Sequence, residues 1–335
     1  MAKQIKKNIK KSIKRRSKVK RKSKSSQLIS ILVIIGIAIF GYWYATNDPA
    51  PLVEYSAHQN EDGFYYYTYV DSGDYYYTAN GLEGNVLLLN ELRDIIHQNF
   101  EPTTYDDARV HLALADQSLT DPTKVWNIYN GVLVDAEWDA QSWHREHVWP
   151  NSRLGMERVT QSGRNQGSDL HNLRAITPAV NSSRGDRFFS NGSGENHTTD
   201  DGGYYPGDAH KGDVARILLY MAVMYDFLIL TDDDLNDTSN HYTMEGTKMG
   251  KLSLLLEWHK EDPVDDFERN RNQVIYEAQG NRNPFIDKPE YVHLIWEGLT
   301  IEELIEPEPE VEPEISVFSY TITMMIIERK EQYNV

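Results

Sequence analysis

Arg145-Glu146-His147-Val148-Trp149-Pro150 is the stretch that decides the fold of this chain's central part. It is followed by Ser168-Asp169-Leu170-His171-Asn172-Leu173 and by Asn181-Ser182-Ser183-Arg184. Because Pro150 disfavours helix in the residue before it, the first stretch is predicted to be extended. Over residues 143–189 we predict a strand, a loop, a second strand and a helix. On a strand, Glu146 and His147 point to opposite faces, so they need not share one role.

These three blocks hold the side chains that hydrolysis of a phosphodiester requires. His147 titrates near neutrality and suits a general base for water. Glu146 and Asn181 carry oxygen ligands of the kind that Mg²⁺ prefers, and a hard cation stabilises developing negative charge. The residues 144–147 match neither H-E-x-x-H nor H-x-x-E-H, so the pattern does not predict a zinc protease. The sequence also lacks a G-x-S-x-G elbow and a P-loop.

Arginine is concentrated in the same region. Residues 141–187 contain seven arginines and no lysine against four acidic residues, a local charge of +3. The planar guanidinium fork matches phosphate oxygens. We predict that Arg145, Arg174 and Asn172 contact substrate. The alternative is that some of these arginines pair with Asp169 and Asp186 in a structural role.

The three blocks resemble the endonuclease I group of the His-Me finger (ββα-metal) nucleases, which are secreted bacterial enzymes that cut DNA and RNA. The resemblance covers about residues 75–297 and includes further matching pieces: Tyr205-Pro206-Gly207, Lys211-Gly212-Asp213-Val214-Ala215-Arg216 and Arg282-Asn283-Pro284-Phe285-Ile286-Asp287. It implies an α+β fold in which a ββα-metal core is embedded in a mostly helical domain.

The resemblance also implies roles for individual residues. His147 would be the general base, and Glu146 and Asn181 would bind a single metal ion, Mg²⁺ or alternatively Mn²⁺ or Ca²⁺. An arginine would hold the cleaved phosphate, and the candidates are Arg164 and Arg184. We expect the enzyme to be a monomer.

The amino-terminal part consists of a basic block and an apolar run. Residues 1–24 contain thirteen Lys and Arg and no acid, whereas the other 21 Lys and Arg face all 51 Asp and Glu, a net charge of −30. Residues 28–45 carry no charge, and as a helix they would extend about 27 Å, enough to cross a bilayer core. Because positive charge stays on the cytoplasmic side, we predict that residues 1–27 lie inside the cell, that residues 28–45 are an uncleaved membrane anchor, and that the enzyme lies outside. A cleaved signal peptide and a secreted enzyme are the alternative.

Beyond the anchor we predict a linker at 46–62 and a nuclease domain at 63–300. Residues 64–68 and 74–78 are rich in Tyr and Thr and predict strands. Helical patterns occur at about 84–99, 105–117, 213–230, 248–260 and 263–279, and the third is apolar nearly all round and should be buried. Glu-Pro alternation predicts an extended spacer at 301–314, and no role is assigned to 315–335. The absence of cysteine excludes thiolate zinc sites and cysteine nucleophiles.

The sequence therefore predicts a membrane-anchored, extracellular, metal-dependent endonuclease that cuts DNA or RNA or both with little sequence specificity. The runner-up is a non-catalytic nucleic-acid-binding or adhesion protein on a nuclease scaffold. The net charge of −30 argues against that runner-up, because binding without turnover depends on neutralising phosphates. A metal-dependent phosphomonoesterase would need more metal ligands, often for two ions.

Overall fold

The predicted order of strand, loop, strand and helix is present around His147. In the computed structural model, which describes residues 57–59, 65–67, 75–82, 84–236 and 239–300, β5 (His144–His147) pairs antiparallel with β6 (Leu173–Ile176). Helix α4 (Pro178–Arg184) follows at once, and Pro178 occupies its first turn, where the missing N–H costs nothing. The prediction for residues 143–189 is confirmed.

The other elements alternate short strands with helices, which agrees with the predicted α+β class. The helices are α2 (Asn85–His97), α3 (Ala108–Ala115), α5 (Lys211–Met224), α6 (Leu252–Glu261), α7 (Asp266–Gln279), α8 (Pro284–Asp287) and α9 (Glu290–Val292), with the 3-10 turns η1 (Tyr77–Ala79), η2 (Asn151–Arg153) and η3 (Met244–Gly246) and the π-helical turn η4 (His293–Glu297). The strands are β1 (Ala57–Gln59), β2 (Tyr65–Tyr67), β3 (Lys124–Trp126), β4 (Leu133–Asp135), β7 (His197–Thr198), β8 (Tyr204–Tyr205), β9 (Ile229–Leu230) and β10 (Lys248–Met249). Within the described ranges they pair as five two-stranded sheets, β1–β2, β3–β4, β5–β6, β7–β8 and β9–β10.

Helix α5 is the buried helix that the sequence predicts. Twelve of its fourteen residues are buried, and α2 and α6 pack against it. It ends at Met224 rather than near residue 230, because Tyr225 is extended and the chain then enters β9. Arg216, which interrupts the apolar face, is neutralised by Glu268 of α7 through two hydrogen bonds of 2.7 and 2.6 Å.

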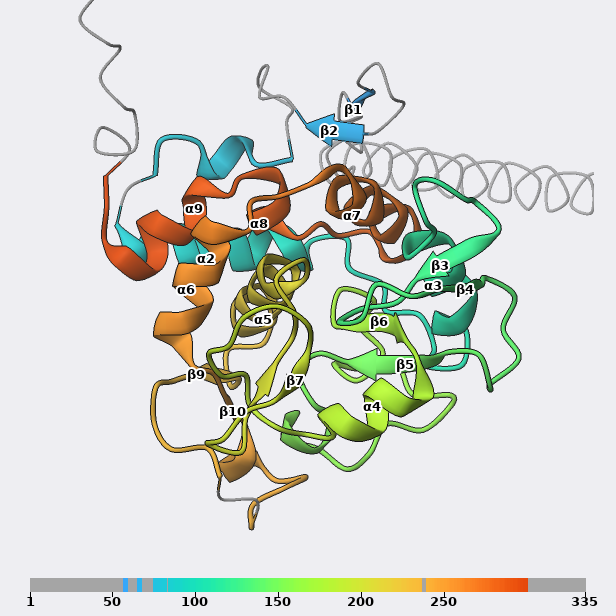
Figure 1. Cartoon of the computed structure of the whole chain (residues 1–335). Coiled ribbons are helices and arrows are strands. Elements are labelled where there is room, and N and C mark those ends of the chain that lie inside the picture. Colours follow the sequence, from blue (N-terminus) through green and yellow to red (C-terminus); the bar gives the residue numbers. More distant parts are fainter. Residues whose placement is uncertain (1–56, 60–64, 68–74, 83, 237–238, 301–335) are drawn as a thin grey trace, which may run out of the picture. The chain divides into compact units, whose positions relative to one another are not determined.

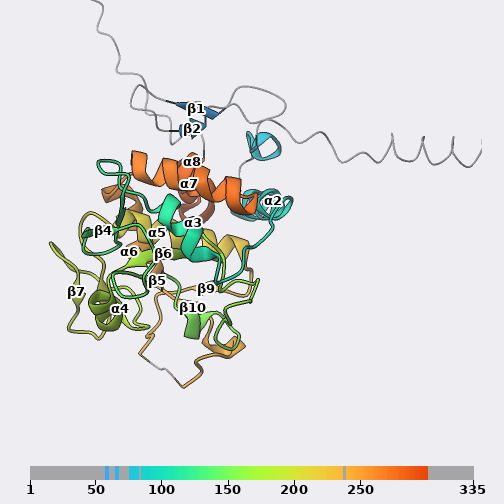
Figure 2. The ribbon, with the colours of Figure 1, turned by 90° about the vertical axis from the view of Figure 1, so that its right-hand side faces the viewer.

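The β5–β6 hairpin lies between two hydrophobic clusters. Trp149 and Ile176 belong to the large cluster around α5, whereas Trp143 and Leu173 belong to a smaller one with α3 and α7. Both ribbon views place α7 and α8 above the hairpin and α4 below it (Figures 1 and 2). Packing on two sides fixes the strand that carries Glu146 and His147.

The strand predicted at 74–78 is not formed, and this prediction is wrong. Residues 77–79 make the turn η1, and β2 pairs instead with β1, which falls within the predicted linker. The Tyr75 ring meets the edge of Tyr276 in α7, and the Tyr76 hydroxyl donates to Asp287 at 2.7 Å. Burial of both rings against the helices outweighs the strand preference of tyrosine.

Several predictions concern residues outside the described ranges. They are the basic block at 1–27, the membrane anchor at 28–45, the spacer at 301–314 and the tail at 315–335. Among the described residues, no helix has both the length and the apolar character that crossing a bilayer requires.

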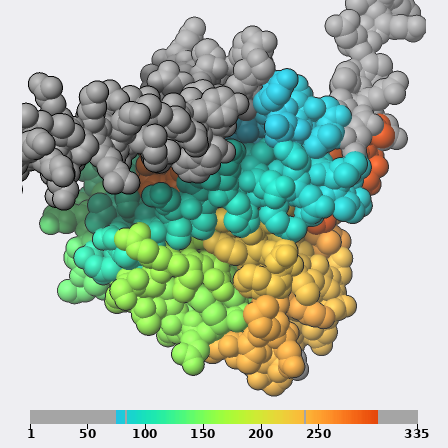
Figure 3. Space-filling model, turned by 180° about the vertical axis from the view of Figure 1, so that it is seen from behind, coloured from blue at the N-terminus to red at the C-terminus, as the bar shows by residue number. Residues whose placement is uncertain are grey.

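Seen from behind, the segments around residues 150–170 (green) and 240–260 (orange) meet on one face (Figure 3).

Candidate active site

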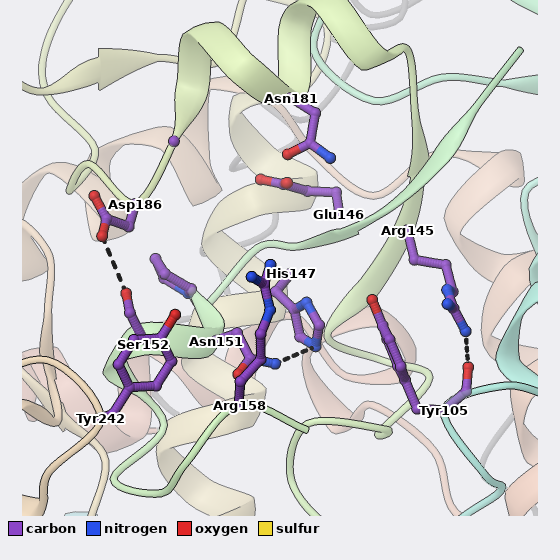
Figure 4. A pocket seen from close by; sticks show the side chains of 12 residues that line it. Tyr105, Arg145, Glu146, His147, Asn151, Ser152, Arg158, Asn181, Asp186 and Tyr242 are labelled. Carbon is purple, nitrogen blue, oxygen red and sulfur yellow. Dashed lines mark hydrogen bonds between the residues drawn. The ribbon is translucent and has the colours of Figure 1, made fainter. Parts of the chain in front are cut away.

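A pocket of about 370 Å³ opens beside β5, the carboxyl end of α4 and the turn η2. Its walls are formed by Tyr105, Arg145, Glu146, His147, Pro150, Asn151, Ser152, Arg158, Asn181, Gly185, Asp186 and Tyr242. Figure 4 shows Glu146 and Asn181 side by side on one wall, with His147 and Arg158 below them. The structure thus brings together four of the residues that the sequence singles out, Arg145, Glu146, His147 and Asn181, from two blocks more than thirty positions apart.

His147 is held as a neutral base. Its Nε2 lies 2.8 Å from the carbonyl oxygen of Gly167. A carbonyl only accepts, so Nε2 carries the hydrogen and Nδ1 keeps a lone pair. Burial lowers the pKa of His147 to about 4, and the nearby cations Arg145 and Arg158 act in the same direction. At neutral pH the ring is therefore uncharged and able to accept a proton at Nδ1.

The ring of His147 is also fixed in orientation. It stacks on Tyr105, with centroids 5.3 Å apart and planes 27° apart. Asn151 Nδ2 also lies 3.1 Å from Nε2, but both nitrogens are donors in this tautomer, so this approach is not a hydrogen bond. A turn of the imidazole that exchanged its two nitrogens would lose the contact of Nε2 with the Gly167 carbonyl.

Glu146 points away from His147, as expected for neighbours on a strand, yet both reach the pocket. Its Oε1 accepts from the Tyr129 hydroxyl at 2.9 Å and lies 3.3 Å from Nε of Arg184. Its Oε2 has no partner among the described residues. Burial raises the pKa of Glu146 to about 7, against the opposing effects of Arg184 and Tyr129. One oxygen is thus anchored and the other is left for a ligand.

The Glu146–Asn181 pair fits a hard divalent cation. The Asn181 side chain faces Glu146 from α4 and makes no hydrogen bond to the described residues. One carboxylate and one amide oxygen, with water and phosphate oxygens completing the shell, suit the way Mg²⁺ is bound in proteins. No group of three or more His, Cys, Asp and Glu side chains able to hold a metal occurs in the described part of the chain. A site of this kind would therefore need ligands from water and substrate.

Two arginines reach the pocket, and they differ in how freely they can act. Arg145 lies 3.7 Å over the Tyr105 ring and donates to the Tyr105 carbonyl and to Gln161. Arg158 is exposed and has no hydrogen bond or ion pair to any described residue. Arg158 is therefore the pocket guanidinium that is free to take a phosphate.

Four predicted substrate or catalytic residues lie elsewhere. Arg164 donates to the Pro102 carbonyl at 2.8 Å and does not line the pocket. Arg174 is buried between Asp116 and Asp213. The Asn172 amide bonds the main chain of Trp149 on both sides. Arg174 and Asn172 satisfy buried groups that would lack partners without them, whereas the contact of Arg164 is exposed.

Arg184 stands directly behind the pocket. Its guanidinium donates to the carbonyls of Val148 and Gly185 and contacts Glu146, and only 1 % of the residue is exposed. It can orient the Glu146 carboxylate but cannot reach a phosphate in the pocket. Asp169, from the second sequence block, is likewise structural, because it accepts from Tyr220, Tyr225 and Gln279.

The sequence did not predict four further contributors to the site: Tyr129, the Gly167 carbonyl, Arg158 and Tyr242. Only Arg158 carried a signal, as one member of the arginine-rich stretch. Tyr129 has a left-handed backbone with φ of 74°, and its hydroxyl donates to Glu146 Oε1 at 2.9 Å. A main-chain carbonyl leaves no trace in a sequence, since every residue has one.

Comparison with known proteins agrees with this geometry. The model of the endonuclease I family matches residues 90–290. The chain belongs to the endonuclease I family. It is 38 % identical over 244 residues to an extracellular ribonuclease of Bacillus subtilis (strain 168), covering 68 % of this chain and 80 % of the relative. An extracellular ribonuclease of Bacillus amyloliquefaciens is 39 % identical over 237 residues, with coverages of 68 % and 79 %.

A more distant relative is endonuclease-1 of Buchnera aphidicola subsp. Baizongia pistaciae (strain Bp), 26 % identical over 133 residues, or 36 % of this chain and 46 % of the relative. As an endonuclease I family member, the chain is a nuclease, which confirms the predicted family and enzyme class. Nucleases of this family generally depend on a divalent metal ion. The extracellular setting predicted here agrees with the names of both Bacillus relatives.

Proposed function

We propose that this endonuclease I family member hydrolyses phosphodiester bonds of RNA and DNA outside the cell, with little sequence specificity, and that His147 activates the attacking water. The observation that carries the proposal is the 2.8 Å contact of His147 Nε2 with the Gly167 carbonyl. It leaves Nδ1 as a neutral base in the pocket that also holds Glu146, Asn181 and Arg158.

In the proposed reaction, Nδ1 of His147 removes a proton from water as the water oxygen attacks phosphorus, and the phosphorus–oxygen bond to the leaving sugar breaks. The leaving sugar oxygen takes a proton from solvent water. The lowered pKa of the imidazole ensures that Nδ1 is unprotonated at neutral pH. The stacked Tyr105 ring and the Gly167 carbonyl keep Nδ1 directed at the water. Fixed orientation of this kind removes part of the entropic barrier to the reaction.

Glu146 and Asn181 would hold a single divalent ion, Mg²⁺ or alternatively Mn²⁺ or Ca²⁺. When bound, the ion neutralises negative charge that develops on the phosphate oxygens. Arg184 and Tyr129 both contact Oε1 of the same carboxylate, which leaves Oε2 without a partner among the described residues. These two are positioning residues, because neither reaches the reacting atoms.

Arg158 would hold the cleaved phosphate, with Arg145 as a second cation at the edge of the pocket. Charge-assisted hydrogen bonds from guanidinium to phosphate are among the stronger polar contacts in proteins. Arg158 makes no hydrogen bond or ion pair to a described residue, which supports this role better than the occupied guanidiniums of Arg164, Arg174 and Arg184.

The test is incubation of the full chain, in detergent, with supercoiled plasmid and with single-stranded RNA. We expect cleavage of both, loss of cleavage in EDTA, and recovery on addition of excess Mg²⁺ or Mn²⁺. Binding of either nucleic acid without cleavage, at any concentration of added metal, would favour a non-catalytic surface protein.

The location of the enzyme rests on the sequence alone. We propose that residues 28–45 anchor the chain in the cell membrane, with residues 1–27 inside. Protease added to intact cells should then remove the cell-bound nuclease activity. Activity found freely soluble in the medium, with a chain that starts near residue 46, would indicate a cleaved signal peptide.

A further inference from the structure

The pocket has two tyrosine walls of different character. Tyr105 is engaged on both faces, by His147 at 5.3 Å and by the Arg145 guanidinium at 3.7 Å. Tyr242, on the opposite side, is 41 % exposed, and its hydroxyl has no partner among the described residues. Figure 4 shows Arg158 between the two rings. One tyrosine is thus part of the catalytic support. The other has an edge contact with the His241 ring at 6.5 Å and otherwise presents an exposed aromatic surface.

Tyr242 lies in a loop, residues 239–246, whose backbone is strained and bonded to the pocket wall. Its backbone is left-handed, with φ of 61°, a conformation that is costly for a bulky side chain. Its N–H donates to the Ser152 carbonyl at 2.7 Å. Nearby, a Cβ on Gly246 would lie 2.2 Å from the Asn240 carbonyl oxygen, so the loop closes only with glycine there.

Further contacts fasten the same loop to the segment that carries Arg158. His241 Nδ1 and Ser152 Oγ both lie 3.2 Å from Asp186 Oδ2. Arg153 donates to the Leu235 carbonyl at 3.0 Å. Figure 3 shows these two segments side by side. Ser152 contacts Asp186 rather than His241, so the cluster is an anchor and not an activated serine.

Charge decides which part of a substrate can lie against Tyr242. Asp186 lines the pocket on this side and repels phosphate, whereas Arg158 attracts it. A nucleotide whose phosphate is held at Arg158 therefore directs an uncharged part, its base or sugar, toward the tyrosine. Stacking of a base on an exposed aromatic ring tolerates any sequence, because every base has a π-face.

We propose that Tyr242 is the stacking platform for a nucleobase next to the cleaved phosphate, so that the site favours single-stranded RNA or DNA whose bases can leave the stack. The inference rests on the proposed function and names the substrate class of that site. The residue binds the substrate and takes no part in proton transfer.

The test compares a thymidine 12-mer with a 12-mer of the same backbone that lacks bases. With the parent enzyme we expect faster cleavage of the thymidine strand at limiting concentration. Tyr242→Ala should raise KM for that strand by about five- to twentyfold, the lower part of the range for base stacking, with little change in kcat. On the abasic strand the variant and the parent should be equal. Tyr242→Trp should retain the parental KM, and Tyr77→Ala, which removes an exposed tyrosine outside the pocket, should change neither substrate.

Equal losses of Tyr242→Ala on the two strands would overturn the proposal, because they would mean that the loop only supports the site. Unchanged KM for the thymidine strand would overturn it as well. Failure of the parent enzyme to cut either strand with Mg²⁺ present would instead overturn the proposed function itself.

Discussion

The candidate active-site pocket and the buried ion network between β6, α5 and α7 use polar and charged side chains in opposite ways. In the network every buried charge has an opposite charge within 3.0 Å: Arg174 with Asp116 and Asp213, Arg271 with Asp116, and Arg216 with Glu268. In the pocket, the Nδ1 of His147, the Oε2 of Glu146, the Asn181 amide and the Arg158 guanidinium have no partner among the described residues.

This difference separates stability from function. Buried charges without partners are costly, so the network must be complete for the domain to fold. The pocket groups are solvated or held by a second contact, so they can remain open for substrate. Changes in the pocket should therefore lower activity and leave stability nearly unchanged, and changes in the network should do the reverse.

The largest effect is expected from His147→Ala. Loss of a general base typically lowers the rate by about 10²–10⁴-fold, and the free energy of unfolding should change little. Single-turnover cleavage of RNA and chemical denaturation measure the two quantities. His144→Ala, on the same strand and outside the pocket, is the matched control and should keep most activity. If His147→Ala cleaved RNA at the parental single-turnover rate, His147 could not be the general base.

The opposite result is expected in the network. Arg174→Met leaves Asp116 short of one partner and Asp213 unpaired while buried, and should lower the free energy of unfolding by about 3–5 kcal/mol. Denaturant titration is the measurement. Lys248→Met breaks the exposed pair with Asp233 and should cost at most about 1 kcal/mol. If both variants lost a similarly small free energy of unfolding, the buried network would contribute no more to stability than the exposed ion pair.

Two arginines of the same stretch provide a sharper comparison. Arg158→Ala should lower kcat/KM by about 10–100-fold, the value of charge-assisted hydrogen bonds to phosphate, without destabilising the protein. Arg164→Ala should lower kcat/KM little, because its guanidinium contacts the Pro102 carbonyl outside the pocket. A large loss of kcat/KM in Arg164→Ala with a small loss in Arg158→Ala would instead assign phosphate binding to Arg164.

The smallest effect is a shift in pH dependence. Burial raises the pKa of Glu146 to about 7, above its ordinary value of 4.5, so in the metal-free protein it gains a proton as the pH falls through 7. Protons then compete with the metal ion. His147, with a pKa of about 4, stays neutral over this range.

At limiting Mg²⁺, kcat/KM should therefore fall below about pH 7, and saturating Mg²⁺ should move the midpoint to lower pH. Rate profiles at two Mg²⁺ concentrations make the measurement. If the midpoint of the kcat/KM profile did not change with Mg²⁺ concentration, the loss of activity at low pH would be due to a group other than Glu146.

Much of the local structure followed from periodicity. The patterns at 84–99, 105–117, 248–260 and 263–279 correspond to α2, α3, α6 and α7, because a helix needs only neighbours along the chain to show its apolar face. The strand at 74–78 failed for the opposite reason. Contacts of Tyr75 and Tyr76 with residues some 200 positions away decided their conformation.

For the site, the sequence by itself determined which chemistry is present: a histidine beside a carboxylate, an amide and a surplus of arginine. Only the tertiary structure decided which of these groups are buried in ion pairs and which face the pocket. It buried Arg174 and Arg184 against carboxylates, left Arg158 unpaired, and brought Tyr242 to the pocket from about 90 residues away. The physical reason is that residue type sets what a side chain can do, whereas long-range packing sets which of its partners is within reach.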